Sequence, residues 1–130
     1  MTIIQRVKLL HLPLDQLVVI GSGVVDALGL RRSSDIDLAV SGELFVRLQN
    51  GGSYQVNQRH GGIVLESDGV EIWRDWGNEL PFDILYRDGM MIDGITFCHP
   101  TTVLEWKLRH DRPKDRVDIR LLQQYLNKTA

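Results

Sequence analysis

The sequence predicts an α+β fold in which a mixed β-sheet is backed by helices on one side. Two observations lead to this class. Segments with helical spacing alternate along the chain with segments that are β-branched or alternate in polarity. Several short strand patterns in the middle are separated by tight turns. With 130 residues and 43% apolar content, the chain suits one compact domain, which we expect to span residues 1–130.

Four elements are predicted in the first third of the chain. Apolar residues with helical spacing indicate a short helix at residues 3–11, which Pro13 ends. The continuous apolar run Leu17–Ile20 is typical of a strand covered on both faces. A short helix is expected over Val24–Leu30. Asp35–Val40 alternates polar and apolar residues, which predicts a strand with one face exposed to water.

The rest of the chain adds one helix, a group of short strands and two C-terminal helices. The helix covers Glu43–Gln49. The expected strands are Tyr54–Gln58, Ile63–Glu66, Val70–Trp73, Phe82–Tyr86 and Ile95–Cys98. Pro100 suits the first position of a helix that runs to about His110. Pro113 opens a last helix, which carries an apolar stripe.

Composition excludes several classes of function. The formal net charge is −2, so a large nucleic-acid footprint is not implied. Cys98 is the single cysteine, which rules out an internal disulfide and fits a reducing cytoplasm. No apolar run approaches the roughly 20 residues that a membrane helix needs. We therefore expect a cytoplasmic protein with no membrane contact.

A glycine turn and a pair of carboxylates carry the chemistry. Gly21-Ser22-Gly23 follows the first apolar strand, and a turn of this kind offers free N–H groups to phosphates. Asp35 and Asp37 are two residues apart on a predicted strand, so they share one face. Two like charges this close are costly unless a cation lies between them, and oxygen ligands favour Mg²⁺. The stretch predicts a metal site and a phosphate site together.

Two other nucleotide-binding motifs are excluded by spacing. The dinucleotide fingerprint requires a third glycine where Asp26 stands. The Walker pattern requires Gly-Lys-Ser/Thr after the loop, where Val24 and Val25 stand. Taken alone, the glycine turn also fits an ordinary strand-to-helix connection.

Together these motifs resemble the signature of the nucleotidyltransferase superfamily with the DNA polymerase beta-like fold, in its small stand-alone form. Ile20-Gly21-Ser22 is followed by twelve residues and then by Asp35-Ile36-Asp37-Leu38. Val70-Glu71-Ile72-Trp73, the helix carrying Lys107, and Lys114-Asp115 continue the resemblance. It implies that a nucleoside monophosphate is transferred from a nucleoside triphosphate to an acceptor, with loss of pyrophosphate.

The resemblance also implies the ligands of two Mg²⁺ ions. Asp35 and Asp37 would hold both metals, which act on the acceptor oxygen and on the leaving phosphate. A third carboxylate completes the site, and Glu71 is the first choice because its apolar neighbours turn away from it. Asp83, in Phe82-Asp83-Ile84-Leu85, has the same local pattern and stays open as the alternative.

The phosphates have their own candidate ligands. Gly21 and Ser22 would bind the β- or γ-phosphate through the turn. Lys107 would supply a counter-charge to the triphosphate, the alternative being an ordinary exposed helix lysine. Arg31 and Arg32 fit either carboxylate pairing or phosphate contact. Asp115 suits the helix dipole and is also suited to orient Lys107.

The acceptor and partners stay open at this point. A protein hydroxyl, an RNA end or a small molecule would each serve as acceptor. A second copy of the chain, or a small helical partner as in toxin–antitoxin pairs, would complete the acceptor site. The alternative function is a non-catalytic protein of the same fold that binds a nucleotide or a partner. A sugar transferase that uses Asp-x-Asp fits less well, because such enzymes are much larger.

Overall fold

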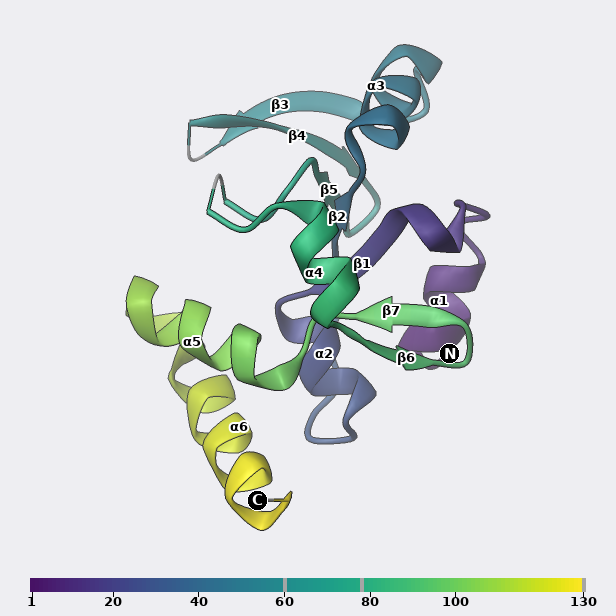
Figure 1. Cartoon of the computed structure of the whole chain (residues 1–130). Helices are drawn as coiled ribbons and strands as arrows, with labels where there is room; N and C mark the ends of the chain where they lie inside the picture. The colour runs from purple at the N-terminus through teal and green to yellow at the C-terminus, as the bar shows by residue number, and fades with distance from the viewer. Residues whose placement is uncertain (60, 78, 130) are drawn as a thin grey trace.

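The computed structural model of the chain describes residues 1–59, 61–77 and 79–129. Within these ranges, seven strands form one mixed sheet in the order β3-β4-β5-β2-β1-β7-β6, with helices packed around it (Figure 1). The predicted α+β class with a mixed sheet is confirmed. None of the helices in these ranges combines the length and the hydropathy that a membrane-spanning segment requires.

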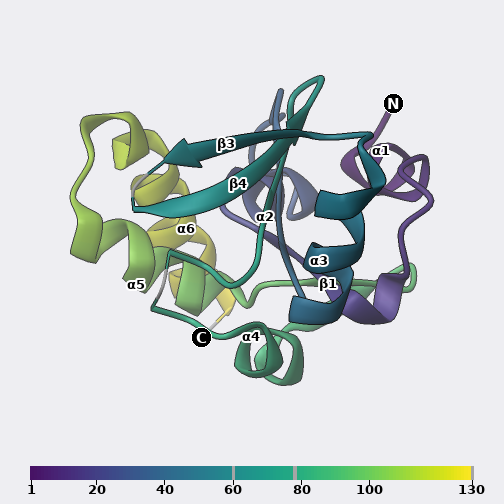
Figure 2. The same cartoon turned by 90° about the horizontal axis from the view of Figure 1, so that it is seen from above.

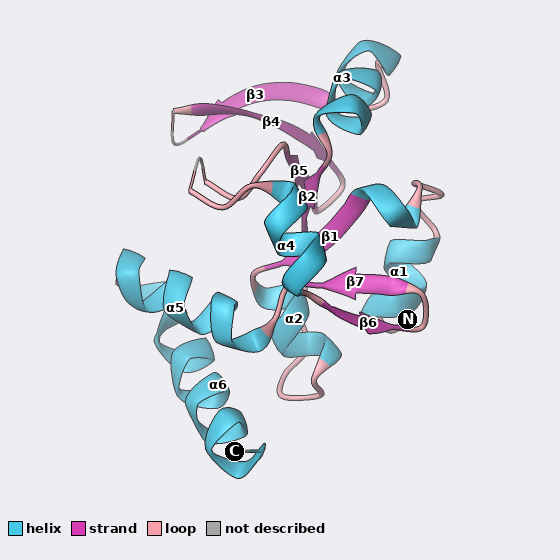
Figure 3. Cartoon of the chain, viewed as in Figure 1, coloured by secondary structure: helices cyan, strands magenta, loops and turns pink. Residues whose placement is uncertain are grey.

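Figure 3 shows how helices and strands alternate along the chain. The strands are β1 (Leu17–Ile20), β2 (Ile36–Val40), β3 (Gln55–Arg59), β4 (Gly62–Ser67), β5 (Val70–Trp73), β6 (Met90–Ile92) and β7 (Ile95–Phe97). The α-helices are α1 (Ile3–Lys8), α2 (Ser22–Ala27), α3 (Gly42–Gly51), α4 (Phe82–Asp88), α5 (Pro100–His110) and α6 (Arg116–Thr129). Short 3₁₀ turns, η1 (Leu14–Gln16) and η2 (Pro113–Asp115), precede β1 and α6. Helices α5 and α6 pack against each other at one end of the molecule (Figure 2).

The centre of the sheet is formed by β1, β2 and β5. All four residues of β1 are buried, as expected for a strand covered on both faces. β1 pairs antiparallel with β2, and Ile20 lies opposite Asp37. β2 pairs parallel with β5, and Asp37 lies opposite Glu71. Because directly paired residues point to the same face, the Asp37 and Glu71 side chains leave the sheet side by side.

Helices cover both faces of the sheet, so the expectation of helices on one side is only partly met. A Cβ on Gly23 of α2 would lie 2.6 Å from Val19 Cγ1 and 3.7 Å from Ile3 Cδ1. Val19 therefore faces α1 and α2, whereas Asp37 faces the other way by strand alternation. The end of α4 lies on the Asp37 face, where a Cβ on Gly89 would come within 2.8 Å of Thr96 Cγ2.

The predicted strand at Phe82–Tyr86 is wrong, because α4 occupies this segment. Pro81 precedes the helix with an extended backbone, and Asp75 Oδ1 accepts a hydrogen bond from the Phe82 N–H at 2.8 Å. This side chain caps the first turn from seven residues upstream. Phe82 and Leu85 then bury one helical face. The short strand β6 was also not predicted from the sequence.

Gly89 is the position where a small substitution is expected to disturb the fold. Its φ of −76° suits any residue, but an added Cβ would lie 2.7 Å from Phe97 O and 2.9 Å from Leu85 O. We expect Gly89→Ala to lower the free energy of unfolding by about 1–3 kcal/mol, because backbone atoms must move. Urea denaturation measures this change.

Gly51→Ala is the matched control for that experiment. Gly51 ends α3, and a Cβ added to it would have no described atom within 4 Å. Alanine is the better helix former, so this variant is expected to be unchanged or more stable by about 0.5–1 kcal/mol. Equal unfolding free energies for the two variants would contradict the close packing at Gly89.

Candidate functional site

The glycine turn lies directly beside the Asp37 carboxylate. Gly21 connects β1 to α2 with a φ of 63°, which favours glycine. A Cβ at this position would lie 3.4 Å from Asp37 Oδ2. The turn and Asp37 are neighbours because Ile20, the last residue of β1, is the register partner of Asp37. The sheet thus brings together two motifs that are separate in the sequence.

Asp37 and Glu71 form a pair of neighbouring carboxyl groups on adjacent strands. Burial of Asp37, then the charge and hydrogen bond of Glu71, then the charge of Asp35 raise the pKa of Asp37 to about 7. A hydrogen bond between two carboxyl groups requires that one of them carries a proton. Asp37 Oδ1 is also buried, with no hydrogen-bond partner among the residues that the structure describes. With its pKa raised to about 7, Asp37 carries a proton over much of the range below neutral pH, and a cation at this position would favour its ionised form.

Asp35 lies near the Asp37–Glu71 pair, two residues before Asp37 in the chain. It is exposed and comes just before β2, and its Oδ1 would lie 3.5 Å from a Cβ on Gly69. The Ile36 N–H, one residue later, donates to Gly69 O at 2.8 Å and fixes this approach. Asp35 and Glu71 line an open hollow of about 490 Å³, together with Lys114.

The same hollow is bordered by an arginine and a further glutamate that no sequence motif singled out. Arg59 on β3 contacts Glu66 Oε1 at 3.0 Å and Glu71 Oε1 at 3.6 Å. Glu66 and Glu71 are register partners on β4 and β5, so the alternation of these strands could have placed Glu66 on the site face. Arg59 on β3 could not be placed without the strand order.

The carboxylates have the right chemistry for Mg²⁺, but the pKa of Asp37 is raised to about 7. In the parts of the chain that the structure describes, no group of three or more His, Cys, Asp or Glu side chains is arranged to hold a metal ion. Oxygen donors on a strand face and the unpartnered Asp37 Oδ1 nevertheless fit the ligand preference of a hard divalent cation. For Asp37 to bind the ion near neutral pH, its carboxyl group must release its proton.

The structure places Ser22 and Lys107 in an ion-pair network, away from open solvent. Ser22 Oγ donates to Asp118 Oδ2 at 3.0 Å and accepts from Arg31 Nη2 at 2.9 Å. Lys107 is 2% exposed, and its Nζ lies 2.8 Å from Asp115 Oδ1 and 3.5 Å from Asp118 Oδ2. Lys107 is therefore not the exposed helix lysine that the sequence offered as an alternative.

The network is a run of alternating charges that joins α2, α5 and α6. Arg112 and Lys107 contact Asp115, while Lys107 and Arg31 contact Asp118. Burial alone would raise the pKa of Asp118, but the hydrogen bond from Arg31 and the charge of Lys107 lower it. Of the two roles that the sequence left open for Arg31, the structure shows carboxylate pairing. No sequence motif pointed to Asp118, whose partners Ser22 and Arg31 lie 96 and 87 residues away along the chain.

Asp83 is not part of this site. It lies exposed on α4, and the strand on which that alternative depended is absent. Glu71 is the carboxylate that the register pairs with Asp37. In comparisons with known proteins, no family model matches this chain, and neither a curated protein nor a solved structure is significantly similar to it. The function must therefore be inferred from the residues of the site.

The carboxylate pair predicts an unusual pH dependence of stability. The pKa of Asp37 rises from 3.8 to about 7 on folding, so between these values the folded chain binds more protons than the unfolded chain. This contribution to stability is present below about pH 4 and is lost as the pH rises to 7. In the presence of a metal chelator, we expect Asp37 to lower the free energy of unfolding by about 2–4 kcal/mol more at pH 8 than at pH 5.

Asp37→Asn isolates this effect, because the amide is neutral at every pH. The variant should lose this part of the pH dependence, and at pH 8 it should be more stable than the wild type. Urea denaturation of both proteins at the two pH values measures the difference. Parallel pH profiles for the two proteins would show that the pKa of Asp37 is not raised on folding.

Proposed function

We propose that the protein is a metal-dependent nucleotidyltransferase with a polymerase beta-like catalytic sheet. It would move a nucleoside monophosphate from a nucleoside triphosphate to an acceptor. The observation that carries this proposal is the Asp37–Glu71 pair, two partly buried carboxylates in register on neighbouring strands. Asp35 and the glycine turn lie next to it.

A pair of this kind is costly to a protein that does not use it. Like charges in a buried setting raise each other's pKa and weaken the fold above neutral pH. A divalent cation would reverse that cost, and Asp35, Asp37 and Glu71 are the residues that would hold it. When bound there, Mg²⁺ would activate the acceptor hydroxyl and neutralise phosphate charge.

In the proposed nucleotidyl transfer, each bond that forms is matched by one that breaks. The acceptor oxygen forms a bond to the α-phosphorus, and the bond from that phosphorus to the bridging oxygen breaks. Pyrophosphate leaves with the electron pair, and the proton of the acceptor hydroxyl passes to a carboxylate. We assign that proton to Glu71, because its side chain lines the hollow and is only half-buried.

Lys114 is the better candidate than Lys107 for contact with the triphosphate. Lys114 is exposed at the hollow, its charge lowers the pKa of Asp37, and no ion pair occupies it within the described residues. Lys107 would first have to leave Asp115 and Asp118. The predicted phosphate role of Ser22 would likewise require that its hydroxyl leaves Asp118.

The direct test uses nucleoside triphosphates labelled at the α-phosphate. Each is incubated with the protein, Mg²⁺ and a cell lysate, and the labelled products are separated into protein, RNA and small molecules. We expect transfer of label in one fraction, none with a γ-phosphate label, and none with EDTA. Binding of a triphosphate without transfer in any fraction would instead support the non-catalytic alternative.

A further inference from the structure

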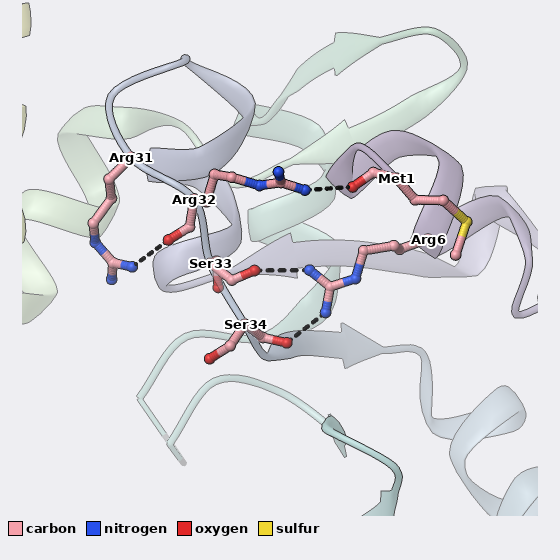
Figure 4. Close-up of a pocket in the computed structure, with 6 residues that line it drawn as sticks. All are labelled: Met1, Arg6, Arg31, Arg32, Ser33 and Ser34. Atoms are coloured by element: carbon pink, nitrogen blue, oxygen red, sulfur yellow. Dashed lines mark hydrogen bonds between the residues drawn. The ribbon is translucent and has the colours of Figure 1, made fainter.

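A second hollow lies where the start of α1 meets the segment that leads into β2. Its volume is about 510 Å³, and Met1, Arg6, Arg31, Arg32, Ser33 and Ser34 line it. Figure 4 shows three arginine side chains gathered around this segment. The hollow is separate from the one lined by Asp35 and Glu71, and we call it the arginine hollow.

Backbone carbonyl groups hold these arginines in place. Arg6 donates from Nη1 to Ser33 O at 2.7 Å and from Nη2 to Ser34 O at 2.5 Å (Figure 4). Arg32 Nη2 donates to Met1 O at 3.0 Å. Carbonyl oxygens are neutral, so these bonds fix the guanidinium groups without cancelling their charge. A ligand would therefore meet arginines whose positions are already restricted.

Two of the three charges have no counter-ion in the described residues. Arg31 is paired with Asp118, whereas Arg6 and Arg32 form no ion pair. The Asp26 carboxylate instead accepts the Ser33 N–H at 2.7 Å. A guanidinium has five N–H donors, of which Arg6 uses two and Arg32 one in these bonds. The remaining donors and charge suit the oxygens of a phosphate ester.

The arginine hollow and the carboxylate hollow flank the same two residues. Ser34 lines the first and Asp35 lines the second. A Cβ on Gly69 would lie 3.5 Å from Asp35 Oδ1 and 3.8 Å from Ser34 O, so both residues pack against the turn before β5. An anion in the arginine hollow would thus lie next to the segment that carries Asp35.

We propose that the arginine hollow binds a backbone phosphate of a single-stranded RNA acceptor. This inference rests on the proposed function, in which the triphosphate occupies the hollow with Lys114. A second anion site beside it would then serve the acceptor. An RNA end carries both groups that this arrangement requires, a phosphate for Arg6 and Arg32 and a free hydroxyl for the carboxylates. Arginine contacts of this kind position a strand without reading its sequence.

Binding of a short fluorescein-labelled RNA, measured by polarisation without Mg²⁺ or nucleotide, tests the proposal separately from catalysis. We expect Arg32→Gln to weaken RNA binding about fivefold or more. The slope of log affinity against log salt concentration should also fall by the equivalent of about one phosphate contact. Arg47→Gln is the matched control, because Arg47 is exposed on α3, beyond the opposite end of β2. It should bind like the wild type.

Arg6→Gln is the second variant, and thermal melting shows that each variant is folded. Unlabelled triphosphate and a short phosphoserine peptide serve as competitors. Poor competition by both would support RNA as the ligand. Equal RNA binding by wild type, Arg32→Gln and Arg6→Gln would overturn the proposal. Loss of triphosphate or phosphopeptide binding in these variants, with RNA binding unchanged, would also overturn it. Failure of label transfer with RNA binding intact would refute the proposed function alone.

Discussion

Asp37→Asn is expected to reduce nucleotidyl transfer by roughly 100-fold or more, while the protein stays folded. The change removes one carboxylate charge from the centre of the site and leaves its shape almost unaltered. A loss of that size corresponds to about 2.7 kcal/mol of transition-state stabilisation. The effect should appear in the rate at saturating triphosphate, because the carboxylate acts on the reacting groups. Transfer of α-phosphate label at pH 8 measures it.

Asp83→Asn is the control for that variant. It makes the same chemical change on an exposed carboxylate of α4, away from the β2–β5 face. We expect its rate to match the wild type. Because Asp37→Asn also relieves repulsion, its unfolding free energy at pH 8 should not fall, which separates loss of catalysis from loss of fold. Full transfer by Asp37→Asn would rule out the proposed metal ligand.

Lys107→Met is expected to have the largest effect on stability, a loss of about 3–5 kcal/mol. Lys107 Nζ is buried between Asp115 and Asp118, and methionine fills much of its volume without a charge. Each carboxylate would then keep one cationic partner, Arg112 for Asp115 and Arg31 for Asp118, and both arginines are partly exposed. Two buried negative charges would then lose the cation between them. Urea denaturation at pH 7 should show the loss.

Lys128→Met removes the same charge from an exposed position near the end of α6 and should change stability by less than about 0.5 kcal/mol. If Lys107→Met unfolds at the same urea concentration as Lys128→Met, the network adds nothing to the fold. Asp118→Asn offers a further comparison of unfolding free energies, because it removes the carboxylate charge to which both Ser22 and Arg31 donate hydrogen bonds.

Much of the sheet, including the face that carries Asp37 and Glu71, could be predicted because the information is local. β1 and β5 match their expected bounds, since β1 is a continuous apolar run and β5 has a single polar residue, Glu71, among apolar ones. α5 begins at Pro100 as expected, because proline suits that position. The sequence pointed to Asp37 through its i, i+2 spacing from Asp35, and to Glu71 through its apolar neighbours. The sheet pairs these two residues, Asp37 and Glu71, on β2 and β5.

What escaped prediction depends on contacts between distant residues. Phe82–Tyr86 was predicted as a strand, but Asp75 caps this segment as a helix that buries Phe82 and Leu85. Lys107 looks like a surface lysine until α6 brings Asp118 beside it. The pairing of Arg6 with Ser33 and Ser34 crosses 27 and 28 residues, so the arginine hollow has no sequence pattern of its own.

The bond between Ser22 and Asp118, which are 96 residues apart, sets the order in which the molecule can be completed. The glycine turn and both aspartates are synthesised before α6. The turn is anchored only when α6 packs beside it and brings Asp118 to Ser22. Asp37 likewise gains Glu71 as its neighbour only after β5 has paired with β2. A ribosome-bound chain that stops short of α6 would therefore carry the motif residues without their assembled geometry.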